Sequence, residues 1–387
     1  MKALQFSRDV PRYATARVTA GIRPGSGATI GPLALVDTDP PVAPTDDWVE
    51  LRPRLAGICG SDLATIDGHS SRYFEPIVSF PFTPGHEVVG DLDDGTRAVL
   101  IPVLDCAVRG IEPVCASCAV GRTNHCERIA FGHLSPGLQT GYCADTGGGW
   151  STRLVAHRSQ LVGVPDDLSD EAAVMVEPTA CAVHAAHLVA ELGPTQLAVI
   201  GSGTLGLSLI AALRHLGAAP GGLIATAKHP IQRDLAGTLG ADRVIPPSEL
   251  TRAVRSASSS FLLGGNQLTG GFDVIVDCVG TDASIEQALA VVAPGGTVVL
   301  VGMPGHVSAD LTTLWHRETA LRGCYAYTRD DFTEAIELVG AAGLDRLVSA
   351  TYPLRRYREA ITHAANAGRR GAVKVAFDLR GEKERNR

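Results

Sequence analysis

The segment QLAVIGSGTLGLSLIAALRHLG, residues 196–217, decides the fold of this chain. It runs from a short apolar strand into a glycine-rich turn and then into a helix with apolar periodicity. In the turn, Gly201 permits a tight bend, Gly203 lets the backbone approach a pyrophosphate, and Gly206 lets helix and strand pack closely. The pattern predicts a dinucleotide-binding unit whose helix N-terminus binds phosphate through free backbone N–H groups.

Further apolar segments follow this turn in a βαβ rhythm. They are GLIATA (222–227), RVIP (243–246), FDVIVDCVG (272–280) and TVVLVGMPG (297–305). Strands that alternate with helices form a parallel sheet covered on both faces. We therefore predict an α/β fold with a Rossmann doubly wound domain over residues 167–330. Its expected cofactor-binding residues in the turn are Gly201, Gly203, Thr204, Leu205 and Gly206.

The end of the second predicted strand indicates the cofactor. An NAD site places Asp or Glu about 20 residues beyond the glycines, where it binds the ribose hydroxyls. Here the position carries Ala227, followed by Lys228 and His229, and Arg233 comes a turn later. Cations pair with a 2′-phosphate, and no carboxylate repels it. We predict NADP rather than NAD; the alternative is that Lys228 and Arg233 are solvated surface charges.

A second stretch, residues 57–90, carries candidate metal ligands: GICGSDLATIDGHSSRYFEPIVSFPFTPGHEVVG. Cys59 offers a thiolate, His86 an imidazole and Glu87 a carboxylate. Zinc accepts sulfur, nitrogen and oxygen, and a catalytic zinc usually has three protein ligands and one open position. Taken singly, these residues are more often structural. Together they indicate a catalytic zinc site, for which we predict Glu177 as the ligand from elsewhere.

Four cysteines lie close together downstream, at positions 106, 115, 118 and 126. Four thiolates at short spacing close a tetrahedral site, which is structural rather than catalytic. The insertion 109–114 leaves Glu112 as an alternative first ligand. We favour Cys106, because soft thiolates bind together in structural zinc sites. The predicted ligands are therefore Cys106, Cys115, Cys118 and Cys126.

Composition sets wider limits. A chain of 387 residues with 45% hydrophobic and 19% charged residues indicates a globular protein of two domains. A net charge of −7 argues against nucleic acid as a partner. The most apolar run, 197–213, is interrupted by glycines and does not favour a membrane span. Without a visible targeting segment or disulfide framework, we expect a reduced, cytoplasmic protein.

The rest of the chain gives coarser expectations. Residues 1–166 are rich in Pro, Gly and β-prone runs, which predicts a β-rich domain with long loops and few helices. A helical stretch over 171–192 is expected to start at Asp167 or Ser169 and to be interrupted at Pro178. Beyond residue 330, two helical segments and the strand AVKVAFDL follow.

The order of six motifs resembles the zinc-dependent medium-chain dehydrogenases, which include alcohol, sorbitol and threonine dehydrogenases. The motifs are GICGSD, PGHEVVG, the cysteine cluster, VEP, GSGTLG and GAVKVAFDL, and they span nearly the whole chain. The resemblance implies a GroES-like catalytic domain over residues 1–166, completed by 331–387, around the Rossmann domain. It also implies a homodimer or homotetramer.

The resemblance further implies roles for single residues. Cys59, His86 and Glu177 would bind the catalytic zinc, and Glu87 would be a neighbouring carboxylate that can approach the metal. The glutamate at position 177 is similar to the polyol and threonine dehydrogenase branch. Lys374 would lie near the cofactor pyrophosphate.

Ser61 is similar to the hydroxyl that binds the substrate oxygen and starts a proton relay in this family. Many relatives continue the relay with a histidine five residues after the first cysteine, but this chain has Ala64 there. His69 is one substitute, although an ordinary loop histidine is the simpler interpretation. The alternatives are that the proton leaves through water or that no relay is needed.

These patterns predict an NADP-preferring, zinc-dependent dehydrogenase of a small alcohol, polyol or sugar-like hydroxyl and its carbonyl. Zinc would lower the pKa of the alcohol, Ser61 would pass on its proton, and hydride would move to the nicotinamide. One alternative is a reductase of a conjugated C=C or C=N bond with the same fold. Another is a non-catalytic NADPH-binding protein, against which the retained metal ligands argue.

Overall fold

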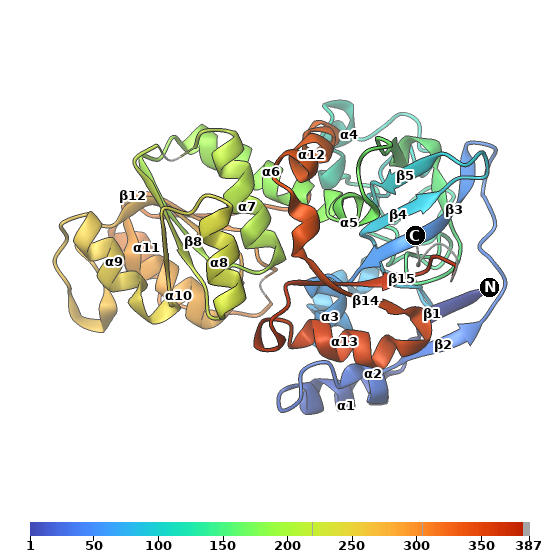
Figure 1. Cartoon of the computed structure of the whole chain (residues 1–387), viewed down its shortest axis with the longest axis horizontal. Coiled ribbons are helices and arrows are strands. Elements are labelled where there is room, and N and C mark those ends of the chain that lie inside the picture. Colours follow the sequence, from blue (N-terminus) through green and yellow to red (C-terminus); the bar gives the residue numbers. More distant parts are fainter. Residues whose placement is uncertain (219, 304, 382–387) are drawn as a thin grey trace. The chain divides into compact units, whose positions relative to one another are not determined.

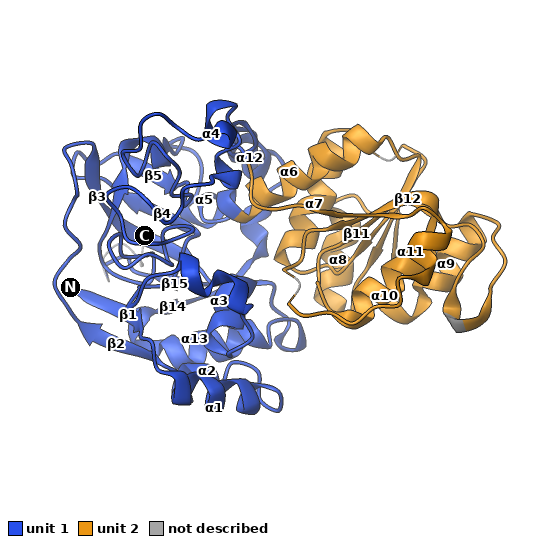
Figure 2. Cartoon of the chain, turned by 180° about the vertical axis from the view of Figure 1, so that it is seen from behind, with its two compact units in different colours: residues 1–177, 328–387 blue, residues 178–327 orange. Residues whose placement is uncertain are grey.

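The computed structural model describes residues 1–218, 220–303 and 305–381. The end of the predicted C-terminal segment, 382–387, lies outside these residues. The chain divides into two compact units, Met1–Glu177 with Thr328–Arg387, and Pro178–Tyr327 (Figure 2). The domain limits placed at residues 166 and 330 stay a prediction. Among the described residues, no helix combines the length and apolar character needed to cross a membrane.

The second unit is built on a six-stranded sheet in the order β10–β9–β8–β11–β12–β13. Every neighbouring pair is parallel. In chain order this is 3-2-1-4-5-6, the strand order of the doubly wound Rossmann fold. The predicted fold class is confirmed for this unit. The strands are β8 (Gln196–Ile200), β9 (Gly222–Thr226), β10 (Arg243–Ile245), β11 (Phe272–Asp277), β12 (Val292–Leu300) and β13 (Ala320–Gly323).

Helices cover this sheet, as Figure 1 shows for α7, α8 and α10. Consecutive residues of β11, from Val274 to Asp277, are all buried. Burial on both faces of a strand requires helices on both sides of the sheet, which explains why these strands are continuous apolar runs. The helices are α7 (Thr204–His215), α8 (Pro230–Thr238), α9 (Leu250–Ala257), α10 (Asp282–Val291) and α11 (Thr312–His316).

The first unit contains a seven-stranded sheet in the order β14–β15–β3–β4–β5–β7, with β6 paired to β3. A separate pair joins β1 to β2. Strand β15 pairs antiparallel with β3, so the C-terminal segment completes this β-rich unit. The strands are β1 (Lys2–Phe6), β2 (Leu33–Asp37), β3 (Trp48–Gly57), β4 (Val88–Asp91), β5 (Arg97–Leu100), β6 (Leu154–His157), β7 (Leu161–Gly163), β14 (Val348–Pro353) and β15 (Lys374–Asp378).

The expectation of few helices in the first 166 residues misses a helical segment between β1 and β2. Helix α1 (Val10–Ala20) begins at Asp9, whose side chain accepts a hydrogen bond from Arg12 N–H. Its buried residues are only Ala16 and Ala20, so it lacks the apolar stripe that reveals most helices. The other helices of this unit are α2 (Gly27–Ile30), α3 (Gly60–Ile66), α4 (Ala116–Ala119), α5 (Asp170–Ala173), α12 (Arg329–Ala341) and α13 (Tyr357–Ala365).

The predicted interruption at Pro178 is wrong. Helix α5 ends at Ala173, and α6 (Val176–Leu192) begins before the proline. Pro178 therefore lies in the first turn of α6, where its missing N–H group leaves no intrahelical bond unmade. The predicted start at Ser169 is confirmed, because its Oγ accepts a hydrogen bond from Ala172 N–H at 3.1 Å. Glu177 consequently lies in the first turn of α6 and is buried.

Asp170 ties the C-terminal segment to the sheet of the first unit. Its carboxylate accepts hydrogen bonds from Arg54 (2.9 Å), Arg97 (3.0 Å) and Arg380 (3.2 Å). Burial raises the pKa of Asp170, but the hydrogen bonds and charges of Arg54 and Arg97 outweigh burial and lower it. A carboxyl with a lowered folded pKa contributes stability above its unfolded pKa, and the contribution is lost as pH falls through the folded value.

Replacing Asp170 with Asn should therefore lower the free energy of unfolding by about 3 kcal/mol near neutral pH, because three guanidinium groups lose a buried charged partner. The difference from wild type should shrink below about pH 4, where the unfolded aspartate is already protonated. Urea unfolding at several pH values measures both effects. Asp91→Asn is the control, since Asp91 is one-third exposed and its ion pair within residues 1–218, 220–303 and 305–381 is with Arg54. Equal losses in both variants would contradict the prediction.

Candidate metal and cofactor sites

Two turns hold the first group of candidate ligands. Cys59 caps the N-terminus of α3, and His86 and Glu87 directly precede β4. Trp150 joins the turns, because its Nε1–H donates to Gly57 O at 3.0 Å and its backbone N–H donates to Pro84 O. The packing leaves no room at Gly57, where a Cβ would lie 1.9 Å from Glu87 Oε2.

The structure brings Cys59, His86 and Glu87 together. Their candidate ligand atoms all lie within 4.8 Å of one another. His86 Nδ1 is buried and makes no hydrogen bond among the described residues. Burial lowers the pKa of His86, but the charge of Asp62 outweighs it and raises this pKa well above its ordinary value. A half-buried sulfur donor with buried nitrogen and oxygen donors, in an environment that favours positive charge, fits a zinc ion.

Lys374 lies against this group rather than at the surface. Its ammonium forms an ion pair with Glu87, and the two side chains are 2% and 1% exposed. Burial lowers the pKa of Lys374, but the charges of Glu87, Cys59 and Glu177 outweigh it. Glu177, the predicted third ligand, is not a member of the group of Cys59, His86 and Glu87 among the described residues, although its charge acts on Lys374. The predicted pyrophosphate contact of Lys374 stays a prediction, and the pairing with Glu87 is an addition from the structure.

Sequence reasoning omitted Asp62. This aspartate is 1% exposed and touches both candidate ligand turns. Its Oδ2 accepts a hydrogen bond from Cys59 N–H at 3.0 Å, and its Oδ1 lies 3.6 Å from His86 Nδ1. The signal was present, because an acidic residue three positions after a helix cap commonly binds back to the cap N–H. Asp62 therefore holds the Cys59 turn by a hydrogen bond and places a second carboxylate oxygen beside the imidazole of His86.

We predict that Asp62→Asn weakens zinc binding at this group roughly 10- to 100-fold, as the loss of an outer partner of a metal-binding histidine usually does. Competition with a chelator of known zinc affinity measures the change. Asp67→Asn is the matched control, since Asp67 is equally buried just beyond α3 but accepts its hydrogen bonds from Gly25 and Gly27. Equal zinc affinity in both variants would count against an orienting role of Asp62.

The candidate relay residues have different environments. Ser61 lies in the first turn of α3 and is half-buried, and Ala64 lies one turn later. His69 is exposed, and its backbone N–H donates to Ala64 O at 2.7 Å. The structure therefore places the His69 side chain at the surface rather than among the candidate ligands.

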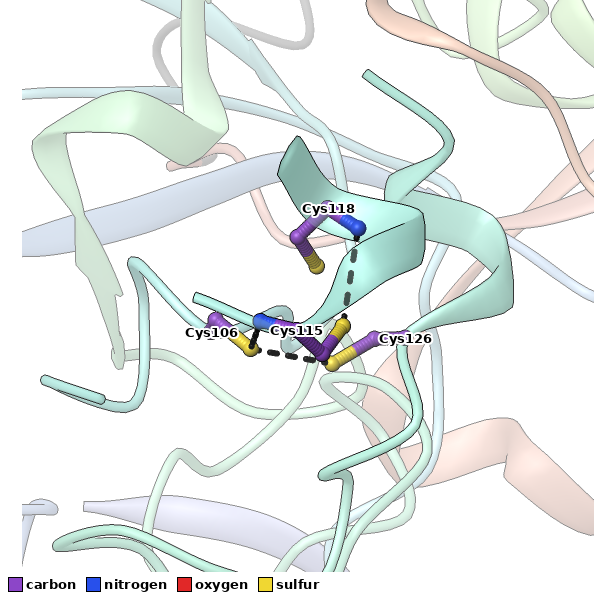
Figure 3. A group of neighbouring side chains, drawn as sticks. All are labelled: Cys106, Cys115, Cys118 and Cys126. Atoms are coloured by element: carbon purple, nitrogen blue, oxygen red, sulfur yellow. Dashed lines mark hydrogen bonds between the residues drawn. The ribbon is translucent and has the colours of Figure 1, made fainter. Parts of the chain in front are cut away.

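The four cysteines form a second group, shown in Figure 3. Their sulfur atoms lie within 4.8 Å of one another, with Cys106 Sγ 3.7 Å from Cys126 Sγ. Backbone N–H groups of Cys115, Cys118 and Arg128 donate to three of these sulfurs. Such bonds favour thiolates, the form that binds zinc. Glu112, the alternative first ligand, is exposed and is not a member of this group.

Arg109 organises the loops around the cysteines, a role that sequence reasoning also missed. It lies in the insertion between the first two cysteines and is 0% exposed. Its guanidinium donates to backbone carbonyls of Leu104 (3.0 Å), Phe131 (3.0 Å) and Gly137 (2.6 Å), among others. A single side chain thus satisfies carbonyls from both sides of the cysteine loop, which irregular backbone requires when it is buried.

The glycine-rich turn in the second unit has the predicted local geometry. Gly201 follows β8 with φ +93°, a conformation that favours glycine. Gly203 caps α7, and a Cβ on Gly206 would lie 1.9 Å from Gly201 O. Gly201 N–H donates to Thr226 Oγ1 at 3.0 Å, so the end of β9 holds the turn in place. The free N–H groups at the start of α7 can bind an anion.

No acidic residue occupies the end of β9 or the start of α8. The hydroxyl of Thr226 accepts the hydrogen bond from Gly201 N–H, and Ala227 is buried. Lys228 is exposed, His229 caps α8, and Arg233 is partly exposed one turn later. The cations that the sequence singled out therefore stand at the carboxyl end of β9, beside the turn.

Comparisons with known proteins agree with this architecture. Residues 45–166 match the profile of an alcohol dehydrogenase GroES-like domain, and residues 204–341 match that of a zinc-binding dehydrogenase. The chain is 26% identical to L-idonate 5-dehydrogenase (NAD(P)(+)) of Escherichia coli K12 over 326 residues, 83% of this chain and 89% of that one. It is 26% identical to sorbitol dehydrogenase of Bacillus subtilis 168 over 333 residues, 82% and 86% of the two chains.

The structure of galactitol-1-phosphate dehydrogenase from Escherichia coli superposes with a TM-score of 0.72 at 21% identity, covering 98% of this chain and 100% of that chain. The fold is thus a GroES-like β-rich unit joined to a Rossmann unit, as the motifs predicted. The chain belongs to the zinc-dependent medium-chain dehydrogenase superfamily.

Proposed function

We propose that this protein is a zinc-dependent oxidoreductase that interconverts a polyol or sugar-like hydroxyl and its carbonyl with NADP(H). The group of Cys59, His86 and Glu87 carries the proposal, because it places sulfur, nitrogen and oxygen donors within 4.8 Å of one another, a mixed set that zinc accepts. The names of the idonate and sorbitol dehydrogenases support a polyhydroxylated substrate.

The charges around the proposed catalytic site suit a divalent cation. Cys59, Glu177 and the buried Asp62 would supply three negative charges near a zinc ion held by Cys59, His86 and Glu177. Glu87 is paired with Lys374, so these two charges offset each other. A buried carboxylate is costly unless a positive charge compensates it, and a bound cation would do so.

When bound, zinc supplies Lewis-acid polarisation of the substrate oxygen. Residues of the chain transfer the proton, position the ligands and bind the cofactor. Ser61 accepts the proton of the substrate hydroxyl as it gives up its own, and Asp62 holds the Cys59 turn with its second oxygen beside His86. The N–H groups of Thr204 and Leu205 would hold the pyrophosphate of the cofactor, which would supply the hydride acceptor.

Zinc content and substrate range test this proposal together. Wild type should hold about two zinc ions per chain, and Cys59→Ala about one, with loss of polyol oxidation. Elemental analysis gives the metal count, and a panel of sorbitol, L-idonate and conjugated enones gives the activity. Cys143→Ala is the matched control, because Cys143 is buried in the same unit outside both cysteine-containing groups.

Two outcomes would favour the alternatives. A single zinc ion that Cys59→Ala leaves unchanged, with reduction of enones, would indicate a reductase of conjugated double bonds. Tight NADPH binding without turnover of any panel member would indicate a binding protein.

We further propose that Lys228 and Arg233, with His229, bind the 2′-phosphate of NADP. The absence of a carboxylate from residues 225–233 and the exposure of Lys228 support this choice. The homo-oligomeric state and the cytoplasmic location expected from the sequence stay predictions.

Removing either cation tests the cofactor proposal. Lys228→Ala and Arg233→Ala should each lower kcat/KM for NADP about tenfold, because one charge-assisted hydrogen bond is worth about 1.4 kcal/mol or more. The value for NAD should stay unchanged, since NAD lacks the phosphate. Arg243→Ala is the control, because Arg243 is exposed at the opposite end of the strands, where β10 begins. Equal losses with both cofactors would contradict the assignment.

A further inference from the structure

A run of hydroxyl groups leads away from the candidate metal site along α3. Tyr142 OH lies 3.2 Å from Thr65 Oγ1, and Thr65 Oγ1 lies 2.8 Å from Ser70 Oγ. Thr65 and Tyr142 are 9% and 8% exposed, while Ser70 is half-buried. The run therefore begins in the core of the first unit and ends near solvent.

The inner end of the run lies beside the candidate ligands. The Tyr142 ring is 6.3 Å from the His86 ring, between centroids. Thr65 follows Ser61 by one helical turn, so the two side chains share a face of α3. Thr65 Oγ1 also lies 2.9 Å from Ser61 O, which fixes its position relative to that residue.

The outer end is held by the helical segment between β1 and β2. Asp67 directly follows α3, and its carboxylate accepts hydrogen bonds from Gly25 N–H (2.7 Å) and Gly27 N–H (3.0 Å). This anchors the segment to the end of α3. Tyr13 of α1 is half-buried, and burial raises the pKa of its phenol although Ser70 acts to lower it.

The donor count permits a proton to pass through Thr65. A threonine hydroxyl donates one hydrogen bond and accepts two. In the structure Thr65 donates to Ser61 O, which leaves its oxygen free to accept from Tyr142 and Ser70. When the Thr65 proton turns toward Ser70, each hydroxyl gives one proton and receives one. No residue changes its charge, and one proton moves outward.

We propose that Tyr142, Thr65 and Ser70 conduct the substrate proton from the face of α3 that carries Ser61 to solvent. This path would replace the histidine that relatives carry at the position of Ala64. The inference rests on the proposed dehydrogenase function. It also gives residues 10–30 a role, which is to hold the outer end of the path through Asp67. These residues precede residue 45, where the match to the family profiles begins.

A pair of variants at one position tests the path. Thr65→Val removes the hydroxyl and keeps the shape, whereas Thr65→Ser keeps the hydroxyl. With the zinc-loaded full chain, NADP and the best panel substrate, Thr65→Val should lower kcat for alcohol oxidation about tenfold or more. Thr65→Ser should stay near wild type. Added imidazole buffer should restore much of the Thr65→Val rate, because it accepts the proton directly.

A second readout separates proton release from hydride transfer. In a stopped-flow mixing experiment, a pH indicator should report proton release that lags behind NADPH formation in Thr65→Val but not in Thr65→Ser. Zinc content and NADPH affinity should be the same in both variants. If Thr65→Val fails to fold, Ser70→Ala, which alters a half-buried side chain, should show the same lag and the same rescue.

Several results would overturn the path. Equal rates and equal proton release in the variant pair would do so while leaving the proposed function intact. The same loss and rescue in His69→Gln, with Thr65→Val unaffected, would assign the relay to the loop histidine. A wild-type enzyme that turns over no alcohol of the panel would overturn the proposed function, and the path with it.

Discussion

The buried ion pair of Lys374 and Glu87 is the interaction on which the first unit depends. A lysine and a glutamate that are both nearly inaccessible to water are tolerable only in contact, because either charge alone would be strongly destabilising. The pair joins the final strand to the turn that holds His86, and Lys374 Nζ reaches Ile58 O beside Cys59. The two turns therefore cannot separate from β15 without exposing an unpaired charge, so the donor group is fixed before a metal binds.

Much of this architecture follows from local sequence, because the relevant constraints are local. The glycine-rich turn requires glycine at positions whose backbone geometry is set by the next few residues, and the βαβ rhythm then determines a parallel sheet. The cysteine cluster is also a local pattern. The order of the strands in the sheet and the close approach of Cys59 to His86 follow from these motifs only through the family resemblance.

What the sequence did not reveal depends on contacts between distant segments or on weak local signals. Arg109 resembles a surface residue until its carbonyl partners from 131–137 are known. Proline can interrupt a helix or stand in its first turn, and the residue type alone does not say which. The break here falls between α5 and α6, so Pro178 lies in the first turn of α6. Helix α1 buries little more than two alanines, which leaves no apolar period to detect. The partner of Lys374 is likewise invisible without the pairing of β15 with β3.

Helix α3 links the metal site to the part of the chain that the family profiles do not match. Cys59 caps it, Ser61 and Asp62 lie in its first turn, and Asp67 just after its last turn holds the segment between β1 and β2. A short helix between two anchored ends has little freedom to shift, so the added segment supports the geometry of the donor group from the far end. Hydroxyl groups suit this rigid setting, because each can give one proton and receive another without a net change of charge and then rotate back. An imidazole that relays a proton passes through a charged form, which a buried environment disfavours.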